Sequence, residues 1–486
     1  MSSSVLSPGR RARLVREAVA TTPGLLKTAL AADCALALLF AIAVDSGIRG
    51  HRQGMQTIGK DSAPSIIAAQ QIRSSLADMH SNAANGLIGK PGENREAAKI
   101  YEARRLEVTE GILAAARNIT YGDKELVPIK TLLQELGHYE ELVAQARLLH
   151  ERRDPDSLLR HREADRLMHQ NLLPAADDLD NANREELDRG YATARATSWR
   201  AMAWVLLAGI ALIGALAATQ LLLYHRMRRV LNPPLIAASM LAAGFLVYAV
   251  TAFATEAHLL KVAKQDAFES IHALQHARAV AYDANGDESR WLLDHSQAAV
   301  YEKAFFDKTA RLAKRPEGLS FDSLVAKIVG GPLPDEFERF LAAGDADAVR
   351  RSVASSLPDG FQGYLADELR NITFPGEREA AIETLKTFAR YVKIDGEIRR
   401  LEGRGDHTAA VALCVGNDPG QSNWAFSRFD DALGKTLDIN QRAFEDSVDR
   451  GFKTLAGFDV ASPLVALGIS LLAYVGLRPR MREYAG

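Results

Sequence analysis

Histidine and aspartate recur at a four-residue spacing in His161, Asp165 and His169. Residues four apart lie on one face of a helix, so these three side chains would share a face. Imidazole and carboxylate groups are common ligands of zinc in proteins. A helical cluster of this kind is usually a polar patch when no partner helix adds a histidine or cysteine. We therefore predict no metal site here.

The stretch Asp283–Ser289, continued to Asp294, has the ligand spacing of a calcium-binding loop. Oxygen-bearing side chains fall at its first, third, fifth, seventh and twelfth positions, as such loops require. The sixth position of these loops needs a glycine, but Glu288 stands there and Gly286 comes two positions earlier. The stretch therefore indicates continuous helix or a helix break rather than a calcium site.

Two arginines are candidates for binding a ligand that carries a carboxylate. Arg73 and Arg278 each lie on the predicted first helix of a bundle, and a guanidinium can hold a carboxylate through two parallel hydrogen bonds. The alternative is a solvated or salt-bridged arginine. The chain contains no glycine-rich phosphate loop, no Walker lysine and no Gly-x-Ser-x-Gly motif. We therefore expect no catalytic residues, no cofactor and no enzymatic activity.

The elements that would position these residues are connected by a central apolar hairpin. Uncharged runs at 201–224 and 235–255 are each long enough to cross the roughly 30 Å hydrocarbon core of a bilayer as a helix. The loop between them carries Arg226, Arg228 and Arg229 and no acidic residue, which predicts that it faces the cytoplasm.

Two further apolar runs, at 28–45 and 457–477, predict one span near each end of the chain. A cleaved signal peptide is the alternative for the first run, but its long basic leader favours an uncleaved span. Because short arginine-rich segments stay in the cytoplasm, an even number of spans places both termini and the hairpin loop inside. The protein is then a multi-pass plasma-membrane protein with cytoplasmic N- and C-termini. Its candidate contacts for a cytoplasmic effector are Arg226, Arg228, Arg229, Arg478, Arg480 and Arg482.

Long amphipathic helices joined by short turns predict an antiparallel bundle on each side of the hairpin. The expected helices are about 56–89, 94–119, 124–152 and 156–199, then 256–284, 289–314, 376–403 and 421–455. The fold class is therefore all-α, with four transmembrane helices and two tandem extracytoplasmic antiparallel four-helix bundles. The predicted segments are a cytoplasmic basic leader (1–27), span one (28–45), bundle one (46–199), span two (200–224), a cytoplasmic loop (225–234), span three (235–255), bundle two (256–456) with an insertion at about 315–369, span four (457–477) and a cytoplasmic tail (478–486).

Short motifs recur in the same order in both halves. Arg117–Tyr121 (Arg-Asn-Ile-Thr-Tyr) returns 253 residues later as Arg370–Phe374, and Asp188–Tyr191 returns as Asp449–Phe452. Ile129–Leu132 also recurs 253 residues later, as Ile382–Leu385. Ordered matches at a nearly constant separation indicate an internal duplication.

The repeated Asn-Ile-Thr-aromatic turns are predicted to lie at bundle tips that point away from the membrane. There they would contact an outer partner; the alternative is that the aromatic ring closes the end of the bundle. The residues concerned are Asn118, Thr120, Tyr121, Asn371, Thr373 and Phe374.

Bulk composition excludes some partners. The formal net charge of −2 creates no overall positive field, so we expect no nucleic-acid binding. The two cysteines, Cys34 and Cys414, lie in different segments and predict no disulfide.

Paired helical bundles attached to spans resemble the four-helix-bundle sensor domains of bacterial chemoreceptors and histidine kinases. More narrowly, the two Asn-Ile-Thr-aromatic turns, the run Leu172–Asp178 and the ending Gly476–Arg480 resemble a family of actinobacterial four-span membrane proteins. A member of that family is encoded beside a glutamine/glutamate-binding lipoprotein and the soluble protein kinase G. The resemblance implies that the lipoprotein binds an amino acid, the membrane protein senses this and the kinase responds.

These observations favour a transmembrane signal relay over three alternatives. The relay would pass nutrient status, in particular amino-acid status, from an extracytoplasmic solute-binding lipoprotein to a cytoplasmic serine/threonine kinase resembling protein kinase G. The alternatives are a direct small-molecule sensor, an accessory subunit of a transporter and a passive scaffold. The expected surroundings also include the lipid bilayer, and the sequence is compatible with a homodimer.

Overall fold

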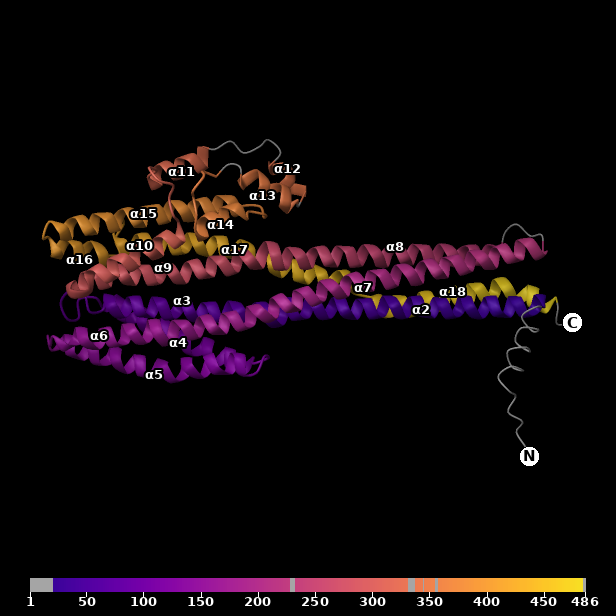
Figure 1. The fold of residues 1–486 in the computed structure, drawn as a ribbon, viewed down its shortest axis with the longest axis horizontal. Helices are drawn as coiled ribbons and strands as arrows, with labels where there is room; N and C mark the ends of the chain where they lie inside the picture. Colours follow the sequence, from indigo (N-terminus) through magenta and orange to yellow (C-terminus); the bar gives the residue numbers. More distant parts are fainter. Residues whose placement is uncertain (1–20, 228–231, 331–336, 344, 355–356, 484–486) are drawn as a thin grey trace, which may run out of the picture. The chain divides into compact units, whose positions relative to one another are not determined.

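The structure is a computed structural model that describes residues 21–227, 232–330, 337–343, 345–354 and 357–483. Within these ranges the chain consists of helices joined by turns and loops, and its one isolated bridge links Lys314 and Gln362, which confirms the predicted all-α class (Figure 1). The chain divides into two compact units. The span unit comprises the described parts of 1–57, 190–260 and 447–486, and the bundle unit comprises those of 58–189 and 261–446.

The span unit contains the apolar parts of four helices that are long enough to cross a membrane, as predicted. They belong to α2 (Thr22–Gln56), α7 (Leu173–Met227), α8 (Pro233–Lys261) and α18 (Phe458–Arg482). Large apolar side chains stay exposed on all four, among them Leu39, Leu207, Met240 and Leu471, which is the surface that lipid would cover. Inside the unit Phe40 packs edge-on against Phe245, with ring centroids 5.8 Å apart. Asp33 accepts a hydrogen bond of 3.0 Å from Thr219, so this buried carboxylate is paired between helices.

The first half of the bundle unit consists of α3 (Ala63–Asn85), α4 (Arg95–Arg117), α5 (Asp123–Glu151), α6 (Asp156–Leu167), the π-helical η2 (Met168–Leu172) and the start of α7. Short turns join these helices, as the sequence predicts. Leu76, Ile112, Leu132 and Leu172 are fully buried between them and form an apolar interior.

The second half contains α9 (Glu269–Leu293), the 3-10 turn η4 (His295–Gln297), α10 (Ala298–Leu312), α15 (Glu377–Gly403) and α17 (Ser422–Thr454). A short helix, α16 (His407–Val415), lies between α15 and α17. The region predicted to be an insertion holds four short helices, α11 (Phe321–Gly330), α12 (Phe337–Ala343), α13 (Ala346–Ala354) and α14 (Tyr364–Arg370).

The helix break expected between 284 and 289 does not exist, because α9 continues to Leu293. Asp283 and Asp287 lie within this helix and form ion pairs with Arg290 and Lys308. The acidic side chains that resembled calcium ligands are therefore already paired with cationic side chains, and the helix turn supplies no loop for an ion.

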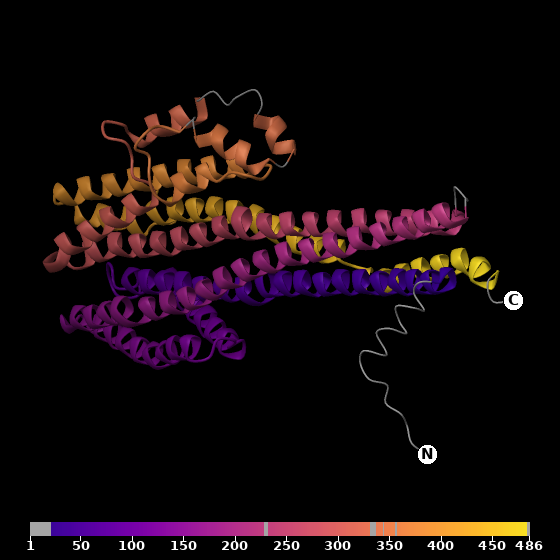
Figure 2. The same ribbon diagram turned by 45° about the vertical axis from the view of Figure 1, so that its right-hand side comes forward.

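Helices α3 and α9 pack against each other and join the two halves of the bundle unit (Figures 1 and 2). Ser81 donates a hydrogen bond of 3.0 Å to Asn285, and Ser289 donates one of 2.5 Å to Asn85. Both pairs advance by four residues on each helix, so α3 and α9 run parallel and in register.

Two π-helical segments precede these central helices. η1 (Thr57–Ser62) lies between α2 and α3, and η3 (Val262–Phe268) lies between α8 and α9. Both are found where the chain passes from the span unit to the bundle unit. π-helical turns inside α-helices occur often at functional sites.

Candidate functional site

A cluster of ionisable side chains lies inside the bundle unit, where α3, α6 and η2 meet α9 and α10. Four of its members, His80, His161, Asp287 and Arg290, are at most 2% exposed. The complete set is His80, His161, Asp165, His169, Asp283, Asp287, Arg290 and Lys308. Buried polar groups of this kind are stable only when they are paired.

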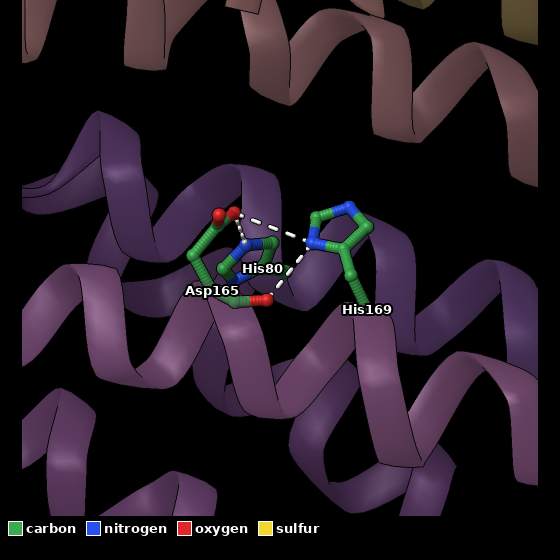
Figure 3. Close-up of side chains that lie close together, drawn as sticks. All are labelled: His80, Asp165 and His169. Carbon is green, nitrogen blue, oxygen red and sulfur yellow. Dashed lines mark hydrogen bonds and ion pairs between the residues drawn. The ribbon is translucent and has the colours of Figure 1, made fainter. Parts of the chain in front are cut away.

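The centre of the cluster consists of His80 from α3, Asp165 from α6 and His169 from η2 (Figure 3). Nε2 of His80 lies 2.8 Å from Oδ1 of Asp165, and Nδ1 of His169 lies 3.3 Å from the same oxygen. Nδ1 of His169 also lies 2.9 Å from the backbone carbonyl oxygen of Asp165. Two imidazoles from different helices thus converge on one carboxylate.

The second ring nitrogen of each imidazole also has a partner. Nδ1 of His80 lies 3.0 Å from the hydroxyl of Tyr139, and Nε2 of His169 lies 3.0 Å from Oδ1 of Asp283. The ring of His161 stacks on that of His80 at 5.8 Å. Nε2 of His161 is buried and has no hydrogen-bond partner within the described residues.

Two cations on the second half of the unit complete the cluster. Arg290 donates hydrogen bonds of 2.5 Å to Asp287 and 3.1 Å to Asp283. Nζ of Lys308 lies 2.7 Å from Asp283 and 2.5 Å from Asp287. Because both carboxylates have two cationic neighbours, the charges are compensated inside the protein.

The environment sets the protonation of the three histidines. Burial lowers the pKa of His80 to about 3 and that of His161 to about 4, so both are neutral near pH 7. Burial also opposes charge on His169, but the carboxylates of Asp283 and Asp165 outweigh it and raise the pKa of His169 to about 10. His169 is therefore an imidazolium that donates to both sides.

One family model matches the part of the chain that carries this centre. Residues 54–192 match the family model of an actinobacterial sensor domain. No curated protein and no solved structure matches the chain. The matched sensor domain covers α3 to the first part of α7, and with the four candidate spans it indicates a membrane-bound sensor.

Both arginines predicted to bind a ligand are paired with aspartates. Arg73, in the matched sensor domain, forms an ion pair with Asp177. Arg278, in the other half, holds Asp430 through two hydrogen bonds of 2.7 Å and 2.6 Å. The salt-bridged alternative is the arrangement observed, and a carboxylate ligand would have to displace an aspartate.

The Asn-Ile-Thr turns do not lie at the end of the bundle where we predicted them. Asn118 donates a hydrogen bond of 2.7 Å to Ser65, and Asn371 donates one of 2.6 Å to Ser270. Both serines lie close to the points where the chain enters the bundle unit, at Ile58 and Lys261. The first helix of each half leads away from this entry and the second helix returns to it, so the turn that follows lies beside the entry. A partner contact at these turns stays a prediction.

A glutamate on the following helix closes each of these turns. Oε2 of Glu125 accepts hydrogen bonds of 2.7 Å from the backbone amides of both Thr120 and Tyr121. Glu377 accepts the corresponding bonds in the second half. Its partners are the amides of Thr373 and Phe374, at 2.7 Å and 2.9 Å.

The predicted cytoplasmic contacts are described only in part. Arg226 is exposed in the last turn of α7, whereas Arg228 and Arg229 lie outside the described residues. Arg478, Arg480 and Arg482 belong to the last turns of α18 rather than to an irregular tail. Arg480 forms an ion pair with Glu483.

A cavity of about 600 Å³ lies at the end of the bundle unit where α3 and α9 finish. Its lining includes five basic side chains, Lys90, His150, Arg153, His295 and His407, and one carboxylate, Asp154. Arg153 adopts a φ of 58°, the left-handed region that favours glycine. An open cavity with this lining favours an anionic guest.

The reasoning from sequence missed His80, Tyr139 and Arg290. His80 and Tyr139 each stand alone in their segments, 59 positions apart, and His80 is 85 positions from Asp165. Arg290 stands three positions after Asp287, inside the stretch that resembles a calcium loop. One signal was present: Ser74–Asn85 is rich in small polar residues, yet the whole run is buried on α3. A helix with that pattern must find polar partners on other helices.

Proposed function

We propose that this protein is a non-enzymatic relay that carries a signal across a membrane. The observation that supports it most is the match of residues 54–192 to an actinobacterial sensor domain, within a chain that has four candidate spans. The bundle unit would receive the signal, and the spans would transmit it.

The contact between α3 and α9 supports a mechanism for the relay. The two helices are held in register by Ser81–Asn285 and Asn85–Ser289, and each follows a span helix after one π-helical segment. Binding to one half would shift α3 against α9 by about 1–2 Å, a displacement typical of helix shifts in signalling proteins. Such a shift would break these hydrogen bonds, so the two polar pairs define the resting register of the helices.

The partners follow from the family resemblance and from the charge pattern. We propose that an extracytoplasmic solute-binding lipoprotein binds the bundle unit in a way that depends on amino-acid status. A cytoplasmic serine/threonine kinase resembling protein kinase G would bind the basic segments around Arg226 and Arg478. The positive-inside bias of these segments supports a topology with both termini in the cytoplasm.

We also infer that the two halves are copies of one sensor unit. Three pairs of contacts support this. The Asn118–Ser65 and Asn371–Ser270 bonds correspond, as do the glutamate closures of the two turns and the Arg73–Asp177 and Arg278–Asp430 pairs. The second half would then carry the same kind of domain as 54–192, interrupted by the four short helices α11–α14.

Photo-crosslinking in native membranes tests the relay. A photoreactive residue replaces either Ile119, which is exposed in the first Asn-Ile-Thr turn, or Arg226, which is exposed at the end of α7. The same residue at Leu207, on the lipid-facing surface of a span, is the control. We expect a solute-binding lipoprotein at position 119 and a serine/threonine kinase at position 226, with neither at position 207. The proposal fails if neither class of protein is captured at its position.

The cavity at the end of α3 and α9 favours a second candidate function, direct sensing of a small anion. Titration calorimetry with free glutamate and aspartate on the purified full-length chain would show binding without any partner protein. Lys90→Gln and Arg153→Gly should then weaken binding, and glycine suits the left-handed backbone at position 153. Arg95→Gln, on the exposed face of α4, is the control. Absence of heat in the wild type would leave the relay through a partner as the only form of the proposal.

A further inference from the structure

We propose that His80, Asp165 and His169 form a binding site for a divalent transition-metal ion of the zinc type. The site lies inside the first half of the bundle unit, and the proposed relay function does not require it.

The positions of the ligand atoms carry this proposal. Nε2 of His80, a carboxylate oxygen of Asp165 and a ring nitrogen of His169 all lie within 4.8 Å of one another. The two imidazole nitrogens are 2.8 Å and 3.3 Å from Oδ1 of Asp165. Ligands at about 2.0–2.1 Å from a tetrahedral zinc ion are roughly 3.3 Å apart. Only small side-chain movements would therefore admit an ion among these three groups (Figure 3).

The ligands come from two helices, which a stable site needs. Asp165 and His169 share one face of α6 and η2, and His80 reaches them from α3. The sequence shows the first two but gives no sign of the third. His169 lies within a π-helical turn, a distortion that often marks functional sites.

The groups behind the ligands are those that orient metal-bound histidines. In most metal sites the free ring nitrogen of a ligand histidine is held by a carboxylate or another polar group. Here Asp283 lies 3.0 Å from Nε2 of His169, and the Tyr139 hydroxyl lies 3.0 Å from Nδ1 of His80. Both rings are thus oriented toward Asp165.

The charge around the site also suits a cation. Three carboxylates, Asp165, Asp283 and Asp287, face Arg290, Lys308 and the imidazolium of His169, and a bound ion would take the place of the proton that His169 carries in the metal-free protein. Arg290 is engaged by Asp283 and Asp287, and its approach to Asp165, 3.5 Å, is not a hydrogen bond. Asp165 therefore remains available for an ion. A water molecule can complete the coordination.

Two other histidine clusters in the described chain are weaker candidates. In the cluster of Asp180, His272 and His276, Arg184 already lies 2.9 Å from Nδ1 of His272, where a metal site would have a hydrogen-bond acceptor. The cluster of His295, Glu402 and His407 is open to solvent, and Nδ1 of His295 is 3.9 Å from the carboxylate. Both serve as internal comparisons.

The test uses full-length protein purified with a tag that contains no histidine, stripped of metal and then titrated with Zn²⁺ and with Co²⁺. Elemental analysis counts the bound ions, and the visible absorption of Co²⁺ reports ligand geometry. We expect one tightly bound ion per chain and a cobalt spectrum of tetrahedral nitrogen and oxygen ligands. His80→Gln and His169→Gln should each abolish this binding, whereas His276→Gln, His407→Gln and the exposed His138→Gln should keep it.

The variant Tyr139→Phe separates a loss of metal binding from a loss of folding. It keeps the buried ring but removes the hydroxyl behind His80, so affinity should fall about 10- to 100-fold while the protein remains folded. Circular dichroism of each variant checks the helical content. The proposal is overturned if the wild type binds no ion, if the His80 and His169 variants bind as the wild type does, or if binding disappears in the His276 or His407 variant instead.

Discussion

Glu288 on α9 is a carboxyl group with no exposure to solvent. The hydroxyl of Tyr391 donates to one of its oxygens at 2.9 Å, and Ser422 donates to the other at 2.9 Å. Burial, and after it the charge of Asp395, raises the pKa of Glu288 to about 8. The carboxyl is therefore protonated near pH 7, and it belongs to the packing of the second half rather than to its charged network.

This protonation predicts a dependence of stability on pH. The folded state holds this proton more tightly than the unfolded state, in which the pKa of a glutamate is about 4.3. The protonated carboxyl therefore makes its full contribution to the free energy of unfolding below that pH. It is lost as the pH rises toward and through about 8, and the loss is on the order of a few kcal/mol. Glu288→Gln, which is neutral at every pH, should flatten this decline and be the more stable protein at pH 8. Thermal unfolding followed by tryptophan fluorescence between pH 5 and pH 9 measures it.

The exposed Glu110→Gln is the matched control, since it removes a carboxylate without removing a buried one. The unfolding temperature of this variant should fall with rising pH as steeply as that of the wild type. Equal slopes for the wild type and the Glu288 variant would contradict the assignment.

Which residues could be found from sequence depended on how they are brought together. The face His161–Asp165–His169 follows from helical periodicity alone. His80 and Asp283, at 85 and 114 positions from their partners, become neighbours only through helix packing. The Asn-Ile-Thr turns lie beside the chain entry because the second helix of each half runs back toward it, a path that the sequence pattern does not show. Helix periods and spans were predictable, whereas pairings between helices were not.

At the scale of the helices, each half depends on a turn that a glutamate closes. Glu125 is the third residue of α5 and reaches back to two amides before the helix, in the manner of a capping box. Glu125 is 3% exposed, so water cannot take its place as the hydrogen-bond acceptor of these two amides. The turn and the start of α5 are therefore fixed together.

Glu125→Ala should lower the free energy of unfolding by about 1–3 kcal/mol, because two amides lose their acceptor. Asp123→Ala, two residues earlier and exposed, removes only a first-turn acid and should cost about 0.3–1 kcal/mol. Chemical denaturation of the two variants beside the wild type measures the difference. Equal costs would show that the hydrogen bonds of Glu125 contribute nothing beyond its charge.

At the scale of the whole molecule, the chain passes between the two units at four places, after Thr57, Arg189, Leu260 and Asp446. Two of these passages lie at π-helical segments, and α7 and α17 run through the other two as continuous helices. On the proposed topology, the basic segments at the cytoplasmic ends of the spans are where the kinase would bind.

Neutralising Arg226, Arg228 and Arg229 together to glutamine should therefore weaken the response of the kinase to amino acids. The bundle unit should stay folded, with an unchanged unfolding temperature. Phosphorylation of a kinase substrate in cells, with and without added amino acid, measures the response. The control replaces Arg95, Arg351 and Arg428, which are exposed in the bundle unit and carry the same total charge. A normal response in the triple loop variant would refute output through this loop.

The parallel pairing of α3 with α9 has a consequence for how such a protein can evolve. In a dimer of identical chains, every substitution at the interface appears twice and must suit both sides. Here the two facing helices are encoded separately, so each can change alone. His80 has no counterpart in α9, where the residue 205 positions later is Asn285. At this position α3 could thus acquire an imidazole while α9 kept an amide, and the two halves are free to diverge in what each of them binds.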